Sequence, residues 1–166
     1  MKMVHLARLL TSTRVQVCFI LETRNSSIKR SSIVNRFNAS DALVVPSQGQ
    51  SGGLWLFWNH EINLTVVDLS SNYIFALCTS TLSPQQFGLI CVYGDPHYQT
   101  TNAIWSQVLN FVVTNSNLPM LCMGDMNDIM HANEKLCPGR PDIRRINAFC
   151  DHVKLCGFID LGYNGP

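Results

Sequence analysis

The sequence predicts a mixed α/β (α+β) fold in a single domain, and three observations support this. Short apolar runs rich in β-forming residues recur along the chain, and amphipathic stretches with helical spacing stand between them. Apolar residues make up 46% of the 166 positions, which is enough for one hydrophobic core. A chain of this length is ample for one domain and short for two. We therefore expect sheets that are covered by helices.

The N-terminal part is predicted to alternate helices with buried strands. Leu6, Leu9 and Leu10 share one side of a short helix, and the run that follows it is almost wholly apolar, as in a strand buried on both faces. Further on, apolar residues are spaced among basic ones, which is typical of a surface helix, and Pro46 ends a short strand. The expected helices cover residues 4–13 and 26–37, and the expected strands cover residues 15–21 and 42–45.

Three strand candidates follow one another in the middle of the chain, over residues 54–58, 62–69 and 73–79. Short polar turns separate them, which predicts an antiparallel meander in which the first run pairs with the second. Gly52 and Gly53 would allow close backbone approach where the first of these strands begins.

The C-terminal part is predicted to contain two strands and two helices. A strand at 87–93 is closed by Gly94-Asp95-Pro96, and residues 101–113 carry a broad apolar stripe typical of a helix. A short strand at 119–123 and a loop at 126–141 come next. A helix at 142–155, with Leu155 among its inward residues, is stopped by Gly157.

Charge and composition exclude several classes of protein. Charged residues are only 14%, and the net charge of +1 excludes a histone-like polycation. No apolar run approaches the roughly 20 residues that cross a bilayer, and His5 and Arg8 interrupt any signal peptide. We therefore expect no membrane partner and an intracellular protein, in the nucleus or cytoplasm, that is not secreted.

The seven cysteines contain no C-x-x-C pair, so a zinc site or a redox dithiol has no support. Cys137, Cys150, Cys156 and His152 match no common spacing of metal ligands. We expect reduced thiols throughout.

Polar groups that suit phosphodiester chemistry follow three predicted strands. Glu22 follows the first strand, Tyr93 ends the strand at 87–93, and Asp125 and Asn127 follow the strand at 119–123. Ligands of open α/β sheets bind at strand ends, and carboxylates are hard oxygen ligands suited to Mg²⁺. Each residue alone has an ordinary structural explanation, as a loop, turn or strand residue, so the inference depends on their conjunction.

Four ordered strings resemble the endonuclease/exonuclease/phosphatase superfamily. They are Phe19-Ile20-Leu21-Glu22-Thr23, Ser51-Gly52-Gly53-Leu54-Trp55, Val92-Tyr93-Gly94-Asp95-Pro96 and Met123-Gly124-Asp125-Met126-Asn127. The sequence is most similar to the apurinic-endonuclease-like domain of plant LINE-type (non-LTR) retrotransposon proteins. Glu134-Lys135, Gly139-Arg140 and the stretch 156–166 also resemble that group.

The resemblance implies a four-layered α/β sandwich of the deoxyribonuclease I-like type and Mg²⁺-dependent (or Mn²⁺-dependent) phosphodiester hydrolysis, with DNA as substrate. In that family Glu22 would ligate the metal, Tyr93 would face the scissile phosphate, and Asp125 would orient or deprotonate the attacking water. Asn127 would hold Asp125 and a phosphate oxygen. Arg24 and Arg140, in loops near these strings, are candidates for contacting the DNA phosphates.

The sequence departs from the family pattern at both ends. Family members open with a strand that carries an Asn and close with a Ser-Asp-His-like string, and neither string is present here. We therefore expect residues 1–166 to form one incomplete domain without the first strand and the C-terminal part. None of the five histidines lies in such a string, and we expect His97 and His131 to be loop residues. Three interpretations stay open: a DNA endonuclease, a phosphatase of the same superfamily, and a catalytically inactive remnant.

Overall fold

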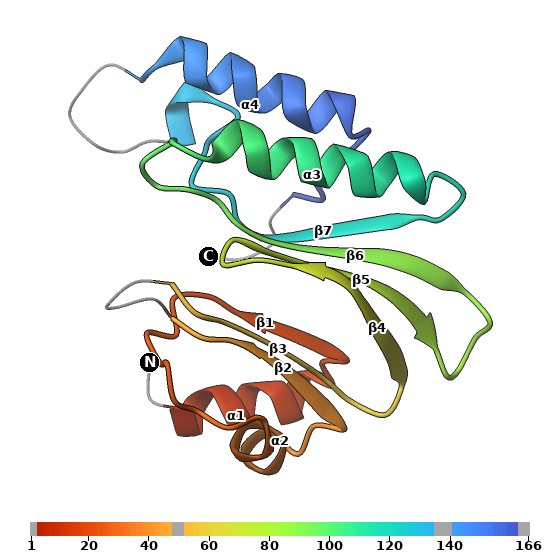
Figure 1. The fold of residues 1–166 in the computed structure, drawn as a ribbon. Coiled ribbons are helices and arrows are strands. Elements are labelled where there is room, and N and C mark those ends of the chain that lie inside the picture. The colour runs from red at the N-terminus through yellow and green to blue at the C-terminus, as the bar shows by residue number, and fades with distance from the viewer. Residues whose placement is uncertain (1–2, 48–51, 135–140, 163–166) are drawn as a thin grey trace. The chain divides into compact units, whose positions relative to one another are not determined.

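The computed structural model describes residues 3–47, 52–134 and 141–162, and the chain forms two compact units. The first unit comprises residues 1–93 and 118–124, and the second comprises residues 94–117 and 125–166. Figure 1 shows the path of the chain through its helices and strands. Within the described ranges, no helix is long and apolar enough to cross a bilayer.

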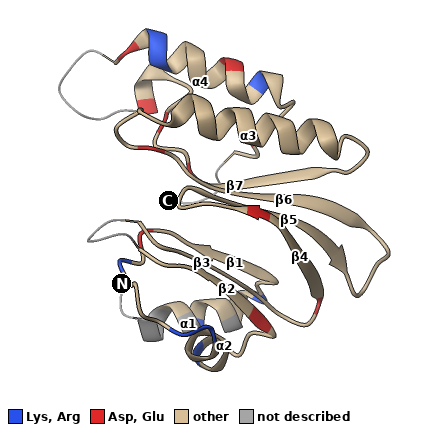
Figure 2. Ribbon diagram, in the orientation of Figure 1, with Lys and Arg blue, Asp and Glu red and all other residues tan. Residues whose placement is uncertain are grey.

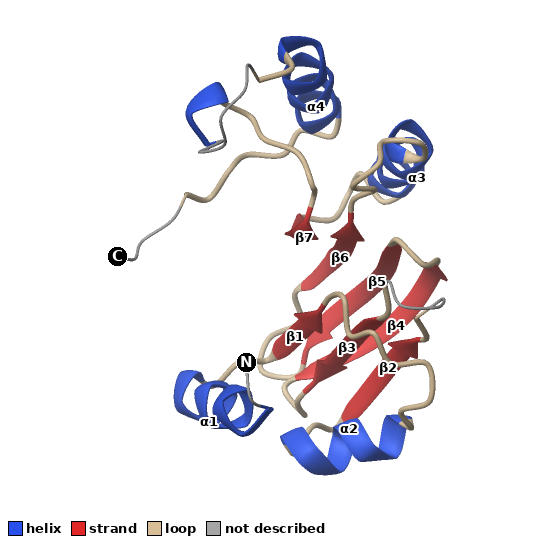
Figure 3. Ribbon diagram, turned by 90° about the vertical axis from the view of Figure 1, so that its left-hand side faces the viewer, coloured by secondary structure: helices blue, strands red, loops and turns tan. Residues whose placement is uncertain are grey.

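Two sheets form the body of the first unit (Figure 3). Among the described residues, one sheet has three strands in the order β1-β3-β2 and the other has four in the order β4-β5-β6-β7. Both β1 and β2 pair antiparallel with β3, and β4, β5 and β6 form an antiparallel meander. The strands are β1 (Val17–Ile20), β2 (Asp41–Val45), β3 (Leu54–Trp58), β4 (Ile62–Leu69), β5 (Tyr73–Ser80), β6 (Gln86–Tyr93) and β7 (Met120–Asp125).

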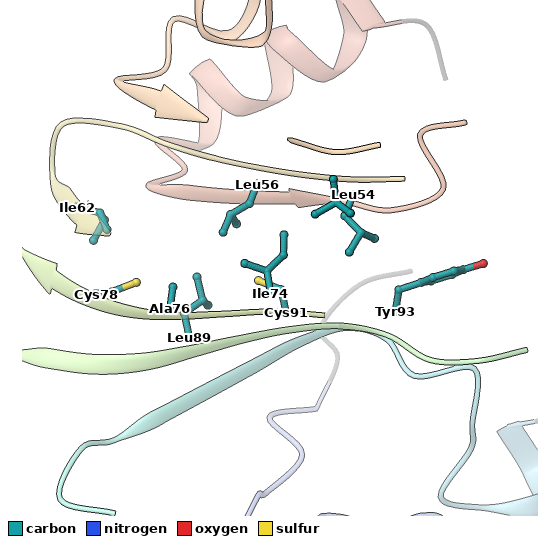
Figure 4. Packing of buried hydrophobic residues seen from close by; sticks show 10 residues of the cluster. Leu54, Leu56, Ile62, Ile74, Ala76, Cys78, Leu89, Cys91 and Tyr93 are labelled. Carbon is teal, nitrogen blue, oxygen red and sulfur yellow. The ribbon is translucent and has the colours of Figure 1, made fainter. Parts of the chain in front are cut away.

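The main core of this unit lies between the two sheets (Figure 4). Leu54 and Leu56 of β3 face Ile74 of β5 and Leu89 of β6, and all four side chains are fully buried. Such facing apolar layers are what holds two sheets together.

The other face of β3 is covered by helices. Trp55 and Phe57 pack with Ile33 of α2 (Arg30–Phe37), and the ring of Phe37 stacks on Phe57 with centroids 4.7 Å apart. Leu10 of α1 (Met3–Thr13) joins the same cluster. Because β3 is apolar on both faces, it is the central strand of its sheet.

The predicted pairing of 54–58 with 62–69 is wrong, although both segments are strands. Residues 59–61 carry the chain from one sheet to the other, with the N–H of Glu61 bonded to the Asn59 side chain. Both edges of β3 are already paired, one with β1 and the other with β2, so β3 has no edge left for β4, which joins the other sheet. The second helix is also shorter than predicted, because Asn25 Oδ1 accepts from the N–H groups of Ser27 and Ile28 in a turn before it.

The second unit contains α3 (Thr101–Thr114), a short 3₁₀ helix (Ala132–Glu134) and α4 (Ile143–Leu155). The two long helices pack together through Trp105 and Phe149, whose rings meet edge to face with centroids 5.6 Å apart. Asp142 caps α4 by accepting from the N–H groups of Arg144 and Arg145. Leu155 was expected to point inward, but it is 67% exposed at the last turn of the helix.

The mixed α/β prediction is confirmed, with two sheets and helices as expected. Trp55 and Trp105 are buried, and Trp58 is partly buried. Whether the 166 residues act as one domain, as the sequence predicts, stays a prediction.

Candidate active site

Glu22 stands just beyond β1 in an unusual backbone conformation. Its φ is +50°, and Arg24 has a φ of +49°. Two backbone hydrogen bonds hold this segment. The Thr23 N–H donates to the Gly53 carbonyl and the Arg24 N–H donates to the Gly52 carbonyl, each at 3.1 Å. Residues with positive φ other than glycine are uncommon, and they concentrate at functional sites.

This contact explains why the second family string carries the pair Gly52-Gly53. Gly53 has a φ of +87°, and a Cβ atom there would collide with the side-chain oxygen of Thr23. Only glycine lets the two segments approach so closely. The glycines therefore fix the backbone that presents Glu22.

Tyr93 and Glu22 meet in the first unit. The Tyr93 hydroxyl donates to Glu22 Oε1 at 2.6 Å, and Arg24 Nη2 lies 3.6 Å from Glu22 Oε2. Tyr93 is buried whereas the Glu22 side chain is half exposed, so a buried hydroxyl holds one carboxylate oxygen while the other lies beside the exposed Arg24. Asn72 fixes Tyr93 in turn, because its carbonyl accepts from the Tyr93 N–H at 2.7 Å and its Nδ2 donates to the Tyr93 carbonyl at 2.9 Å.

Asp125 and Asn127 form a tight turn in the second unit. Asp125 Oδ1 accepts from the Asn127 N–H at 2.9 Å, and Asn127 has a φ of +53°. The Asn127 side chain donates through Nδ2 to the carbonyl of Gly94 at 2.7 Å, and the Gly94 N–H donates to the Asp125 carbonyl, also at 2.7 Å. A side chain at Gly94 would collide with the carbonyl of Met126.

Sequence reasoning missed a cluster that surrounds the Asn127 carbonyl. The Tyr98 hydroxyl donates to this oxygen at 2.6 Å, and the Arg145 guanidinium donates to it as well. Arg145 Nε also donates to Asp128 Oδ1 at 2.7 Å, and the guanidinium lies over the Tyr98 ring. The Asp128 side chain is only 3% exposed, and burial raises the pKa of its carboxyl to about 6.

A signal for this cluster was present in the sequence. Arg145 precedes Phe149 by four residues, so both lie on the same face of their helix, and that face is apolar at Ile146 and Phe149. Asp128 directly follows the Gly-Asp-Met-Asn string, so an acidic side chain next to this string was a candidate partner for the arginine.

The remaining candidates have separate outcomes. Arg24 lies beside Glu22, as described, whereas Arg140 lies outside the described residues. His97 and His131 are both exposed loop residues, as expected. Figure 2 shows the described charged residues scattered over loops and helices, with few on the strands.

The metal and catalytic roles stay predictions. Glu22 and Tyr93 belong to one unit and Asp125 and Asn127 to the other, so their convergence on one cleft is still to be tested. Within the part of the chain that the structure describes, no three acidic, His or Cys side chains gather as a metal-binding group. The half-exposed carboxylate of Glu22 nevertheless fits Mg²⁺, which often binds through one or two carboxylates and keeps several waters.

Comparisons with known proteins address the fold. No protein-family model matches the sequence, and a search of curated proteins finds no match. Solved structures do match. The endonuclease domain of TRAS1, a telomere-specific non-LTR retrotransposon, aligns with 98% of this chain and 68% of its own, with a TM-score of 0.67 and 10% identity. The fold is of the deoxyribonuclease I-like type.

Other matches agree with this fold. An apurinic (AP) endonuclease from Archaeoglobus fulgidus has a TM-score of 0.66 at 11% identity, covering 93% of this chain and 65% of its own. The human nocturnin catalytic domain has a TM-score of 0.56 at 12% identity, covering 76% of this chain. The chain spans only 56% of that domain, so activity and substrate do not follow from the deoxyribonuclease I-like fold itself. These structural neighbours are endonuclease/exonuclease/phosphatase-type proteins.

Proposed function

We propose that this protein is a Mg²⁺-dependent phosphodiester hydrolase, resembling a DNA endonuclease and derived from a plant LINE-type retroelement. The observation that carries the proposal is the Tyr93–Glu22 hydrogen bond, which joins two of the four family strings across 71 residues of sequence. The retroelement origin is supported by the sequence strings and by the likeness to the TRAS1 endonuclease domain. Such an enzyme would meet its DNA in the nucleus.

Each residue has a defined task in this hydrolysis. Glu22 would hold Mg²⁺ (or Mn²⁺), which when bound neutralises charge on the phosphoryl oxygens. Tyr93 orients the Glu22 carboxylate and presents its hydroxyl toward the scissile phosphate. Asp125 accepts a proton from the attacking water, whose oxygen forms the new bond to phosphorus as the bond to the leaving oxygen breaks, and the leaving oxygen takes up a proton from solvent. Asn127 keeps Asp125 in place and donates to a phosphate oxygen.

The substrate contacts are assigned to basic loop residues. Arg24 lies next to Glu22 and is exposed, so it can neutralise a neighbouring phosphate. We assign the same role to Arg140 from its place beside the family strings. Arg24 also attracts the Glu22 carboxylate, so DNA and metal binding should be coupled at this pair.

Nicking of supercoiled plasmid in Mg²⁺ tests the proposal. We expect Asp125→Asn to lower the nicking rate by about 10²- to 10⁴-fold, which is the usual contribution of a positioned general base to the rate. The matched control is Asp151→Asn, which removes an exposed carboxylate from α4 and should leave the rate unchanged. Equal rates for wild type and Asp125→Asn would show that Asp125 is not the general base.

Two alternatives stay open. One solved neighbour is the 3′ phosphatase NExo from Neisseria, in complex with a product DNA hairpin. Release of inorganic phosphate from a 3′-phosphorylated oligonucleotide without plasmid nicking would favour a phosphatase. The inactive remnant is the other alternative, and failure of both assays at saturating Mg²⁺ would favour it.

A further inference from the structure

The carbonyl oxygen of Asn127 accepts hydrogen bonds from two side chains that come from different elements. Tyr98 precedes α3, and Arg145 lies in the first turn of α4. We propose that Arg145, with Tyr98 and Asp128, is a positioning residue that locks Asn127 in its left-handed conformation and thereby aims Asp125 and the Asn127 amide. The catalytic consequence rests on the function proposed above, whereas the conformational one does not.

The geometry fixes Asn127 from every side. Its carbonyl is held by Tyr98 and Arg145, its N–H is bonded to Asp125 Oδ1 at 2.9 Å, and its Nδ2 is bonded to Gly94 at 2.7 Å. A residue other than glycine with φ near +50° stays there only when its surroundings impose it, at a cost of about 1–3 kcal/mol. The two donors on the carbonyl supply that constraint.

The chemistry of the position requires arginine. A guanidinium is a planar fork of N–H donors, so Arg145 reaches the Asn127 carbonyl and the Asp128 carboxylate together while lying over the Tyr98 ring. Lysine has a single ammonium on a flexible stem and cannot keep all three contacts. Asp128 is almost wholly buried, so its carboxylate depends on Arg145 as its partner.

The contacts that Tyr98, Arg145 and Asp128 make around Asn127, which we call the clamp, bear directly on the proposed chemistry. The carbonyl and the N–H of Asn127 belong to peptide planes that are joined at its Cα, so holding the carbonyl limits the backbone rotation that would turn the N–H away from Asp125 Oδ1. The Asp125 carboxylate then keeps one orientation, in which Oδ1 accepts the hydrogen bond from the Asn127 N–H. A shift of about 1 Å in a positioned group can cost on the order of 10² in rate.

A set of variants separates positioning from simple destabilisation. Arg145→Met removes the clamp, and Arg144→Met removes the neighbouring, exposed guanidinium from the same helix turn as the control. We expect Arg145→Met to lower kcat for plasmid nicking by about 10- to 100-fold with KM nearly unchanged. Arg144→Met should leave both parameters unchanged, and Arg145→Lys should not restore kcat.

The Asn127→Ala background is the deciding comparison. If Arg145 acts through Asn127, adding Arg145→Met to Asn127→Ala should cause no further loss of kcat. An equal loss in both backgrounds, or a loss that only follows the folded fraction, would overturn the inference.

Amide hydrogen exchange keeps the clamp testable if the wild type does not nick DNA, an outcome that would defeat the proposed function alone. Arg145→Met should speed exchange of the Asn127 N–H at least tenfold, while exchange in the α4 interior stays unchanged. Unchanged exchange at Asn127 would overturn the clamp whatever the activity.

Discussion

Asp128 is an ionisable residue held almost out of solvent. Burial raises the pKa of its carboxyl to about 6, above the value of about 3.9 in an unfolded chain. Between these values the folded state keeps a proton that the unfolded state has lost. The free energy of unfolding should therefore fall as the pH rises from about 4 to about 6.

Urea denaturation at a series of pH values measures this effect. Asp128→Asn, which cannot ionise, should flatten the fall, whereas the exposed Asp151→Asn should retain it. A slope that is identical in wild type and Asp128→Asn would assign the pH dependence to other groups.

Gly94 is the second residue at which local geometry determines stability. It is buried, and any Cβ atom there would collide with the Met126 carbonyl, which belongs to the backbone and cannot move aside cheaply. We expect Gly94→Ala to lower the free energy of unfolding by more than 2 kcal/mol. Gly157→Ala is the control, because Gly157 has open space around it and a φ of +67°, so it should cost only about 1 kcal/mol. Equal losses in the two variants would show that the turn relaxes around the added methyl group.

At this scale the sequence points to residues whose types belong to a motif, and their roles stay predictions; it misses the residues that are tied only to the fold. Glu22, Tyr93, Asp125 and Asn127 stand in recognisable strings. Arg145 stands among other basic residues and looked like part of a solvated face. Its role depends on Asp128, 17 positions away, and the helical spacing that places Arg145 beside apolar residues does not identify this partner.

At the scale of elements, the strands could be predicted but the partner of one strand could not. An uninterrupted apolar run such as β3 indicates burial on both faces, and alternation in β4 indicates one exposed face. A short turn between two strands favours a hairpin on local grounds alone. Long-range pairing overrides this preference here, because β1 and β2 occupy both edges of β3.

The central place of β3 predicts the cost of truncating it. Leu56 is fully buried between the sheets, so Leu56→Ala should lower the free energy of unfolding by about 2–5 kcal/mol. Leu121→Ala on β7 is the matched control, because Leu121 is 40% exposed and should cost less than about 1 kcal/mol. Chemical denaturation measures both, and a loss below 1 kcal/mol at Leu56 would contradict the packing described between the sheets.

At the scale of the molecule, the cysteines report how the two units unfold. Cys78 and Cys91 are fully buried in the core between the sheets, and burial raises the pKa of the Cys78 thiol to about 11 and that of Cys91 further. Cys156 is buried in the second unit, where burial also raises its pKa. Thiolates are the reactive species, so all three should resist maleimide in the native state at pH 8. The half-buried Cys150 is the internal control and should be labelled before these three thiols.

The denaturant dependence of this labelling tests whether the chain unfolds as one domain. The second unit is built from two segments, 94–117 and 125–166, and residues 118–124 between them form most of strand β7 in the first unit. The chain therefore passes between the units three times, and unfolding of one unit releases an anchor of the other. We expect Cys78, Cys91 and Cys156 to become labelled with a common midpoint in guanidinium, as in a two-state transition. Mass spectrometry of labelled peptides would locate each thiol, and labelling of Cys156 at clearly lower denaturant would divide the chain into two independently unfolding parts.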